Sequence, residues 1–292
     1  MSEITRRTAL AAGAAAAGLF VARSELEALG QEPAKPKGNV KQSVCRWCWN
    51  KVPLDKLAEE CVKLGYKSIE LLGAKDILAV KKFGLGCAIM SSAGSIVDGL
   101  NRKENHDAIL KQLRDNIDFA AAEGVANVLV MSGNRTDKSG KTVADQEGLA
   151  NCALALKKIV GHAEEKKITV CMEGLNSKVN HKDYMYDKTA WGVELCQKVG
   201  SPRFKLLYDI YHMQIMEGDV IATIKANKEY IGHYHTGGVP GRAEIDETQE
   251  LNYPAIIKAI LETGYTGHVG QEFIPRRDPL ASLAQGFRIC DV

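Results

Sequence analysis

The sequence predicts a single (β/α)₈ barrel, or TIM barrel, that follows an export signal and a short linker. Three observations support this fold. Strand-like and helix-like segments alternate eight times, the alternating region is about as long as one barrel, and acidic or histidine residues close four successive strand-like segments. Alternation implies a parallel sheet, and eight units in ~250 residues imply that the sheet closes on itself. No G-x-G-x-x-G motif follows the first strand-like segment, which disfavours a dinucleotide-binding fold.

Residues 1–30 have the pattern of an export signal. Arg6 and Arg7 precede an apolar, alanine-rich run at 11–22, which is too short to span a bilayer comfortably. Paired arginines at this place resemble a twin-arginine signal, so we expect a periplasmic or extracellular protein. An amphipathic helix is the alternative, but the run lacks polar periodicity. Residues 31–42 are interpreted as a linker rich in proline, lysine and glycine, which leaves 43–292 for the barrel.

Each strand-like segment is a short apolar run, and each is followed by a segment of helical character. The strand-like segments are 43–49, 67–71, 86–90, 127–131, 168–172, 204–208, 231–235 and 268–272. The helix-like segments are 54–64, 75–83, 103–123, 145–165, 187–199, 219–227, 253–263 and 279–289. Glycines stand just after five of these helices, where a left-handed residue is favoured, at positions 65, 84, 124, 200 and 264.

The composition is that of an ordinary soluble globular protein, with 45% hydrophobic and 25% charged residues. A net charge of +2, without a dense stripe of lysine and arginine, argues against a nucleic-acid partner. The eight cysteines have no pairing pattern and five of them stand in or beside apolar runs, so we expect buried thiols. Cys45 and Cys48 form a C-x-x-C pair, for which a redox or zinc role is the alternative.

The fifth to eighth strand-like segments each end on a residue that can bind a metal. These residues are Glu173, Asp209, His235 and Glu272, and they are 36, 26 and 37 positions apart, about one βα unit each. Barrel enzymes carry their chemistry at the carboxyl ends of the strands. One such carboxylate alone would be an ordinary salt bridge, but four equivalent positions predict a shared site. Three carboxylates and one imidazole suit Mg²⁺ or Mn²⁺, with Co²⁺ or Zn²⁺ as alternatives.

Four further residues are predicted to contact the substrate. His212 lies three positions after Asp209, where a hydrogen bond within the protein is the alternative role. Arg242 follows the seventh strand and could bind a carboxylate through two hydrogen bonds, unless it is a solvated loop arginine. Trp47, at the end of the first strand, would form a pocket wall or pack in the core. Glu70, at the end of the second strand, would contact substrate or pair with a neighbouring base.

Several motifs resemble the hydroxypyruvate isomerase family, which belongs to the xylose-isomerase-like TIM barrels. They are YDIYHMQIMEGD at 208–219, IGHYH at 231–235, GVPGR at 238–242 and ELNY at 250–253, and the resemblance runs in order from about 43 to 272. It implies one metal held by the four residues above, with Glu173 and Glu272 also moving protons. The bacterial members usually carry glutamine in place of His235, whereas histidine there is similar to the ketose 3-epimerase branch. The loop at 174–182 also departs from the family.

Isomerisation beside a carbonyl needs a base, an electrophile and a proton carrier. We therefore expect the protein to interconvert a 2-keto and a 2-hydroxy-aldehyde compound through an enediolate, with hydroxypyruvate and tartronate semialdehyde as the pair that the resemblance implies. A ketose 3-epimerase is the alternative that His235 favours, whereas Arg242 favours an acidic substrate.

Two other classes of protein fit less well. A phosphodiesterase resembling endonuclease IV should have a histidine-rich, multi-metal site, but the chain has only seven histidines and a balanced charge. An exported solute-binding barrel without activity would not need the intact set of four ligands. The partner that we expect is a small hydroxy-carbonyl or sugar substrate, with no nucleic acid and no membrane beyond the signal; a homo-oligomer is left open.

Overall fold

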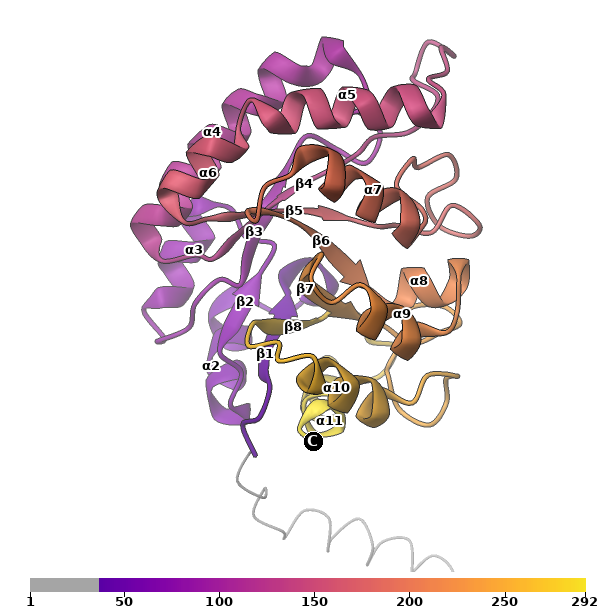
Figure 1. Ribbon diagram of the computed structural model, residues 1–292. Helices are drawn as coiled ribbons and strands as arrows, with labels where there is room; N and C mark the ends of the chain where they lie inside the picture. The colour runs from indigo at the N-terminus through magenta and orange to yellow at the C-terminus, as the bar shows by residue number, and fades with distance from the viewer. Residues whose placement is uncertain (1–36) are drawn as a thin grey trace, which may run out of the picture. The chain divides into compact units, whose positions relative to one another are not determined.

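Eight parallel strands form the sheet at the centre of the fold (Figure 1). The computed structural model describes residues 37–292, so the predicted export signal with Arg6 and Arg7, and most of the linker, lie outside the described residues. The strands are β1 (Lys41–Cys45), β2 (Ser68–Glu70), β3 (Ile89–Ala93), β4 (Asn127–Val130), β5 (Thr169–Glu173), β6 (Phe204–Asp209), β7 (Ile231–Thr236) and β8 (His268–Gln271).

The sheet closes into a nearly complete barrel. Its strands pair in the order β2-β1-β8-β7-β6-β5-β4-β3, so the chain runs once around the ring. Two isolated parallel bridges, Ser68 with Gly86 and Leu72 with Met90, link the β2 edge to the β3 edge. This confirms the predicted (β/α)₈ fold. Because all strands are parallel, their carboxyl ends meet on one face of the barrel.

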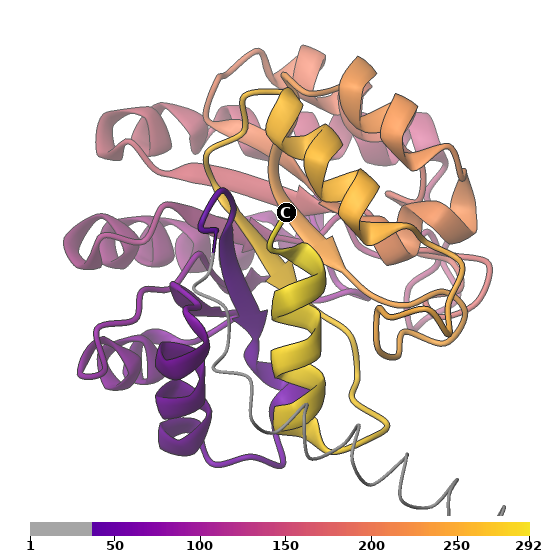
Figure 2. The ribbon, with the colours of Figure 1, turned by 90° about the horizontal axis from the view of Figure 1, so that it is seen from below.

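The helices lie outside the ring of strands (Figures 1 and 2). They are α2 (Leu54–Leu64), α3 (Ala74–Lys81), α4 (His106–Glu123), α5 (Asp145–Lys157), α6 (Val160–Lys166), α7 (Thr189–Val199), α8 (Ile210–Met216), α9 (Val220–Ala226), α10 (Tyr253–Glu262) and α11 (Pro279–Cys290), with short 3₁₀ helices η1 (Arg46–Trp49) and η2 (Lys103–Asn105). Figure 2 shows α11 beside β1, where Gln42 Nε2 donates to the Phe287 carbonyl at 2.9 Å. The end of the chain thus packs against the first strand.

The predicted glycine positions have the expected backbone conformation. All five have a positive φ, between 72° and 100°. Gly65 shows why: its N–H donates to the Cys61 carbonyl and ends α2, a conformation that other residues adopt with strain.

Several predicted boundaries were wrong. The first strand ends at Cys45, and Trp47 lies in η1, whose turn is closed by the Arg46 side chain donating to the Trp49 carbonyl at 2.5 Å. The third strand begins at Ile89 rather than residue 86, because Gly86 pairs with β2 only through the isolated bridge. The long helix predicted at 145–165 is two helices, α5 and α6, separated by a turn that buries Ile159.

Helix α8 was not predicted at all. It begins directly after Asp209, whose side chain accepts hydrogen bonds from the backbone N–H groups of Tyr211 and His212. An aspartate at this position is a strong helix N-cap, so the chain turns from strand to helix without a loop. His212 therefore lies in the first turn of α8, over the end of β6.

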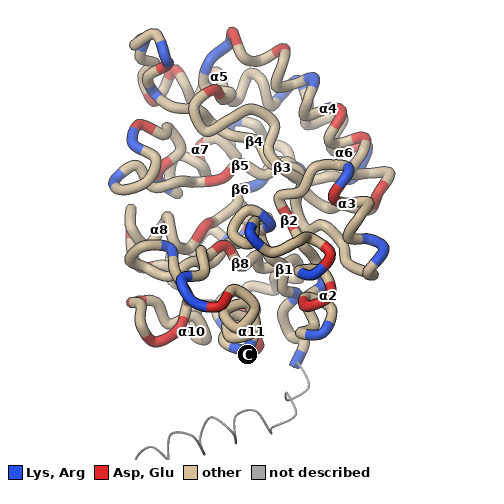
Figure 3. The backbone as a smooth tube through the Cα atoms, turned by 180° about the vertical axis from the view of Figure 1, so that it is seen from behind, with Lys and Arg blue, Asp and Glu red and all other residues tan. Residues whose placement is uncertain are grey.

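Lys and Arg positions are interspersed with Asp and Glu positions along the outer helices and loops in the rear view (Figure 3). Among residues 37–292, no helix is long and apolar enough to cross a membrane. All eight cysteines are free thiols, and seven of them are buried, as predicted for thiols that pack as small apolar side chains. Cys45 and Cys48 are not joined by a disulfide.

Candidate active site and metal centre

The structure brings together the four residues that were predicted as metal ligands. Glu173 and Asp209 end β5 and β6, His235 lies one residue before the end of β7, and Glu272 directly follows β8. Each offers a donor atom within 4.8 Å of the others, and all four side chains are buried. His235 Nδ1 lies 2.6 Å from Glu272 Oε2 and 3.5 Å from Glu173 Oε1.

These residues fit a divalent cation. Buried polar atoms nearly always form a hydrogen bond of good geometry, yet Glu173 Oε1 and His235 Nδ1 form none, although Nδ1 lies close to two carboxylates. Both atoms belong to the four-residue group, and a cation among the carboxylate oxygens would satisfy both. The donors are oxygens and one imidazole nitrogen, the set that Mg²⁺, Mn²⁺ or Zn²⁺ accept.

The electrostatics of the group also favour a cation. Burial, and then repulsion by Glu272, raise the pKa of Glu173. Burial raises the pKa of Asp209 to about 8, although Arg242 opposes the shift. Burial alone would raise the pKa of Glu272 as well, but Arg242 and His235 outweigh it and hold that pKa well below its usual value. Three carboxylates in one dry site repel each other, and positive charge between them relieves the repulsion.

His235 is held by carboxylates on both sides of its ring. Burial opposes a charge on the ring, but Cys45, Glu272 and Glu173 raise the pKa of His235 well above its usual value. A metal at Nδ1 would displace the proton from that atom, so metal binding here is coupled to proton release.

Arg242 lies inside this group rather than at its rim. Its Nη2 donates to Asp209 Oδ2 at 2.8 Å and to Glu272 Oε2 at 2.6 Å, and its Nε donates to the Glu272 carbonyl. Nη1 lies 2.8 Å from His212 Nε2. The three donated hydrogen bonds use three of its five N–H groups, whereas His212 Nε2 carries the proton of a neutral ring whose Nδ1 is an acceptor. The predicted two-point grip on a substrate carboxylate would require Arg242 to exchange one of these hydrogen bonds.

Two aromatic rings pack against the guanidinium of Arg242. Its carbon lies 5.3 Å from the centre of the Trp47 ring and 5.1 Å from that of Tyr211. Trp47 Nε1 also donates to Glu272 Oε1 at 2.7 Å, so Trp47 orients a predicted ligand and lines the pocket described below. The backbone of Arg242 is left-handed, with φ at 55°, which is unusual for a residue other than glycine and common at functional sites.

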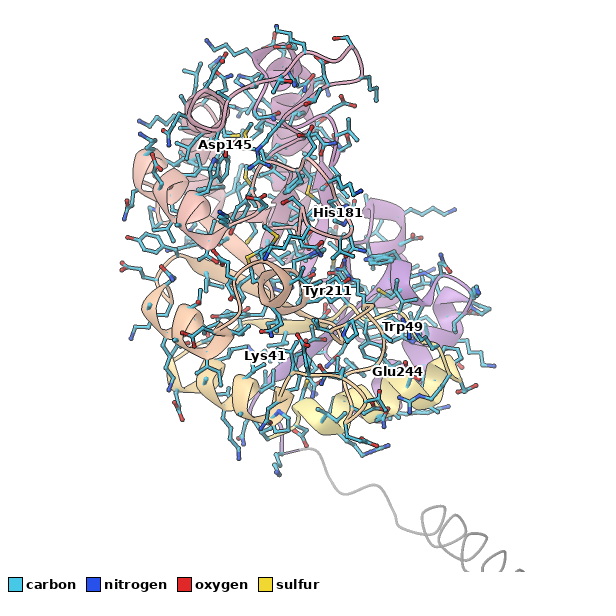
Figure 4. All side chains as sticks on the ribbon, turned by 90° about the vertical axis from the view of Figure 1, so that its right-hand side faces the viewer. Lys41, Trp49, Asp145, His181, Tyr211 and Glu244 are labelled. Atoms are coloured by element: carbon cyan, nitrogen blue, oxygen red, sulfur yellow. The ribbon has the colours of Figure 1, made fainter. Side chains whose placement is uncertain are left out.

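His212 is fully buried between the arginine and the loop after β5. Its Nδ1 accepts a hydrogen bond from the Asn176 backbone N–H at 3.0 Å. Burial, and then the charge of Arg242, hold the pKa of His212 well below its usual value, so the ring is neutral. The rings of Tyr211 and His181, two residues labelled in Figure 4, pack beside it with ring centroids 5.0 and 5.4 Å away.

Glu70 does not line the pocket. Its Oε1 lies 2.7 Å from His235 Nε2 and 3.0 Å from His233 Nε2 in the barrel interior. Of the two roles considered for Glu70, pairing with a base is therefore the one that the structure shows. Burial opposes its charge, but the two histidines outweigh burial and lower the pKa of Glu70.

A pocket of about 380 Å³ opens beside the four-residue group. Glu173, Glu272, Arg242 and Trp47 form its polar side. The opposite wall is mostly apolar: Leu71, Ser91, Ser92, Ile96, Leu129 and Met131 come from β2, β3, β4 and their loops, and Leu175 and His181 come from the loop after β5. Sequence reasoning missed this wall. Only His181 carried a usable signal, because it is a polar residue in the loop that follows a ligand-bearing strand.

A model of the xylose isomerase-like TIM barrel family matches residues 58–290. The chain belongs to this family. A human protein named as a candidate hydroxypyruvate isomerase is 28% identical over 187 residues, which cover 64% of this chain and 68% of the human one. A 2-oxo-tetronate isomerase from Cupriavidus necator is 32% identical over 167 residues, or 57% of this chain and 62% of that protein.

Two solved structures have the same fold. An AP endonuclease, family 2, from Brucella melitensis has a TM-score of 0.72 at 22% identity and covers 84% of this chain and 98% of its own. A 3-keto-D-glucoside 4-epimerase from E. coli has a TM-score of 0.71 at 20% identity. The match covers 86% of this chain and 100% of the epimerase. At these identities the structures show the fold alone. Together with the sequence relatives, which are named as isomerases, the family identifies the chain as an isomerase-type enzyme.

Proposed function

We propose that the chain is a divalent-metal-dependent isomerase that interconverts a 2-keto and a 2-hydroxy-aldehyde compound, with hydroxypyruvate as its substrate. The observation that carries this proposal is the different placement of the four ligands. Glu173 and Glu272 belong both to the metal-binding group and to the pocket lining, whereas Asp209 and His235 do not line the pocket. Two carboxylates can therefore reach a substrate that the other two residues cannot touch.

In this reaction the two glutamates carry the proton. One takes it from the carbon that bears the hydroxyl, which gives an enediolate, and the other supplies a proton to the former carbonyl carbon, while the hydroxyl proton passes to the former carbonyl oxygen. When bound, the cation would stabilise the negative charge that develops on the substrate oxygens. Arg242 and Trp47 hold Glu272 by hydrogen bonds, so this carboxylate keeps its orientation as its protonation changes.

A substrate panel tests the proposal. Mature protein reconstituted with Mg²⁺ or Mn²⁺ should convert hydroxypyruvate and exchange its carbon-bound hydrogen with deuterated water. Tartronate semialdehyde, 2-oxo-tetronate and free ketoses complete the panel. Activity that is unchanged after complete metal removal would contradict the mechanism, and tight metal binding without turnover of any substrate would favour a solute-binding barrel.

Epimerisation of a keto sugar is the second candidate. The pocket falls within the size range of cavities that bind drug-sized ligands, so it has room for more than a three-carbon acid. His235 supports the same reading through its resemblance to the ketose 3-epimerases. Faster turnover of ketoses than of hydroxypyruvate in the panel would decide for this candidate.

We also propose export by the twin-arginine route, supported by Arg6, Arg7 and the apolar run after them. Changing both arginines to lysine should leave the folded protein in the cytoplasm. Cell fractionation measures this, with the unaltered chain as control, and unchanged export of the lysine variant would contradict the proposal.

A further inference from the structure

A second buried polar cluster lies in the barrel interior, next to His235 and away from the pocket. It consists of Cys45, Glu70, His233 and His235, whose side chains are all fully buried. Glu70 Oε1 is its common partner: it lies 2.7 Å from His235 Nε2, 3.0 Å from His233 Nε2 and 3.4 Å from Cys45 Sγ. The proposed reaction uses none of these atoms directly.

The barrel is built to allow this contact. Glu70 is on β2 and His235 on β7, with β1 and β8 between them, so the carboxylate must reach past two strands. On β1 the residue in register with Glu70 is Cys45, and on β8 the residue in register with His235 is Gly270. Both are small. A Cβ on Gly270 would lie 2.2 Å from Glu70 Oε1 and 2.9 Å from His235 Cδ2. Gly270 has no positive φ, so the space, not the backbone, requires glycine.

Hydrogen-bond chemistry then decides where the His235 proton lies. An ionised carboxylate only accepts hydrogen bonds, and burying it without donors is costly. His235 Nε2, at 2.7 Å from Glu70 Oε1, must therefore carry a proton. When a metal takes Nδ1, the atom that faces Glu173 and Glu272, the ring keeps a single N–H, and that N–H is the one on Nε2.

We propose that Glu70 is a positioning residue that keeps the proton of His235 on Nε2, so that Nδ1 is presented to the metal. The inference rests on the metal site of the proposed function, but the proton position can be measured without any metal. Glu70 accepts a hydrogen bond from one ring nitrogen, Nε2, and the other nitrogen, Nδ1, is then free to bind the metal. Partners of this kind set both the tautomer and the orientation of a ligand histidine.

Glu70→Leu removes the acceptor and keeps a similar volume. The ring proton then has a better position on Nδ1, where Glu272 Oε2 lies 2.6 Å away. We expect the dissociation constant for Mn²⁺ to rise by ~10–100-fold, the usual effect of losing such a partner. Glu70→Gln keeps a carbonyl oxygen for Nε2 and should rescue most of the affinity. Gly270→Ala keeps Glu70 but crowds both its carboxylate and the His235 ring, most closely the carboxylate, so it should weaken Mn²⁺ binding in the same direction.

Two quantities are measured for each variant, the affinity for Mn²⁺ and the position of the His235 proton. Mn²⁺ affinity is measured by competition with a fluorescent chelator, and ¹⁵N–¹H correlation spectra of ring-labelled histidine locate the proton, with His235→Gln to assign the signal. Gly286→Ala is the matched control, because its Cβ would also meet a buried side chain, at 2.8 Å from Phe273, but away from this cluster. In wild-type protein we expect a His235 Nε2–H signal both with and without Mg²⁺, whereas in metal-free Glu70→Leu the Nε2–H signal should be lost and only Nδ1–H should remain.

Several results would overturn the inference. One is a wild-type ring that is protonated on Nδ1 alone, and another is Mn²⁺ affinity unchanged in both Glu70→Leu and Gly270→Ala. A third is two Mn²⁺ ions per chain, because Cys45, Glu70 and His235 would then form a second metal site. A double variant supplies a further check: because Glu70 acts through His235, Glu70→Leu should have little further effect on Mn²⁺ affinity when His235→Gln is already present, and a large further effect would contradict the inference. A wild-type chain with the Nε2–H signal but no metal affinity would contradict the proposed function while leaving the tautomer assignment intact.

Discussion

The two halves of the barrel contribute different parts of the site. Strands β5–β8 carry all four predicted metal ligands at their carboxyl ends, and the loop after β7 adds Arg242. The β1–β4 half carries none of those ligands but supplies most of the apolar pocket wall, together with Glu70 in the interior. The β5–β8 half therefore determines which chemistry is available. The β1–β4 half determines which substrate fits and how His235 is held.

The strongest test of this division lies in the ligand half. Glu173→Gln and Glu272→Gln each keep a coordinating oxygen but lose the base, so turnover should fall by ~10²–10⁴-fold while much of the metal is retained. Metal content by mass spectrometry, turnover and deuterium exchange are measured together. Full activity in either variant would remove that residue from the mechanism.

Arg242→Ala should have the next largest effect. If the substrate is a 2-keto acid, the loss of a charge-assisted partner worth ~1.5–3 kcal/mol should raise KM for hydroxypyruvate by roughly 10–100-fold. Neutral ketoses are the comparison. The variant also removes the cation beside Asp209 and Glu272, so thermal unfolding is measured with and without metal to separate this structural effect. An equal, small effect on acidic and neutral substrates would count against a carboxylate role.

A change in the wall half should act on the substrate and leave the metal alone. Met131 is buried and lines the pocket. Met131→Ala should lower kcat/KM by about 10-fold, as expected for loss of an apolar contact with substrate. Metal affinity should not change. Leu113→Ala is a control, because Leu113 is also fully buried but lies on α4, outside the pocket lining. Weakened metal binding in Met131→Ala would show that the two halves are not separable.

His235→Gln should have the mildest effect in the ligand half. Glutamine keeps a ligand oxygen, so we expect part of the metal affinity and of the activity to survive, with an altered preference between hydroxypyruvate and ketoses. Complete loss of metal would show that the imidazole is indispensable. Comparing this variant with the two glutamate variants separates residues that only bind from residues that also move protons.

The sequence predicts the residues of the β5–β8 half of the site but not those of the apolar wall in the β1–β4 half. A carboxylate or histidine at the end of an apolar strand is conspicuous, so Glu173, Asp209, His235 and Glu272 could be picked out one strand at a time. Leu129 and Met131 could not, because an apolar residue that lines a pocket has the same pattern as one in the core. Helix α8 was missed for a local reason: one cap, at Asp209, starts it directly at the end of a strand.

The sequence by itself determined the fold and the set of donors, because the alternation of strands and helices and the residue at each strand end are properties of separate segments. Only the tertiary structure decided which atoms meet. It placed Arg242 among the ligands, aligned Gly270 with His235, and brought Glu70 to the ring from across two strands. These contacts depend on strand register and ring closure, which are set by the packing of the whole barrel and leave no mark on any one segment.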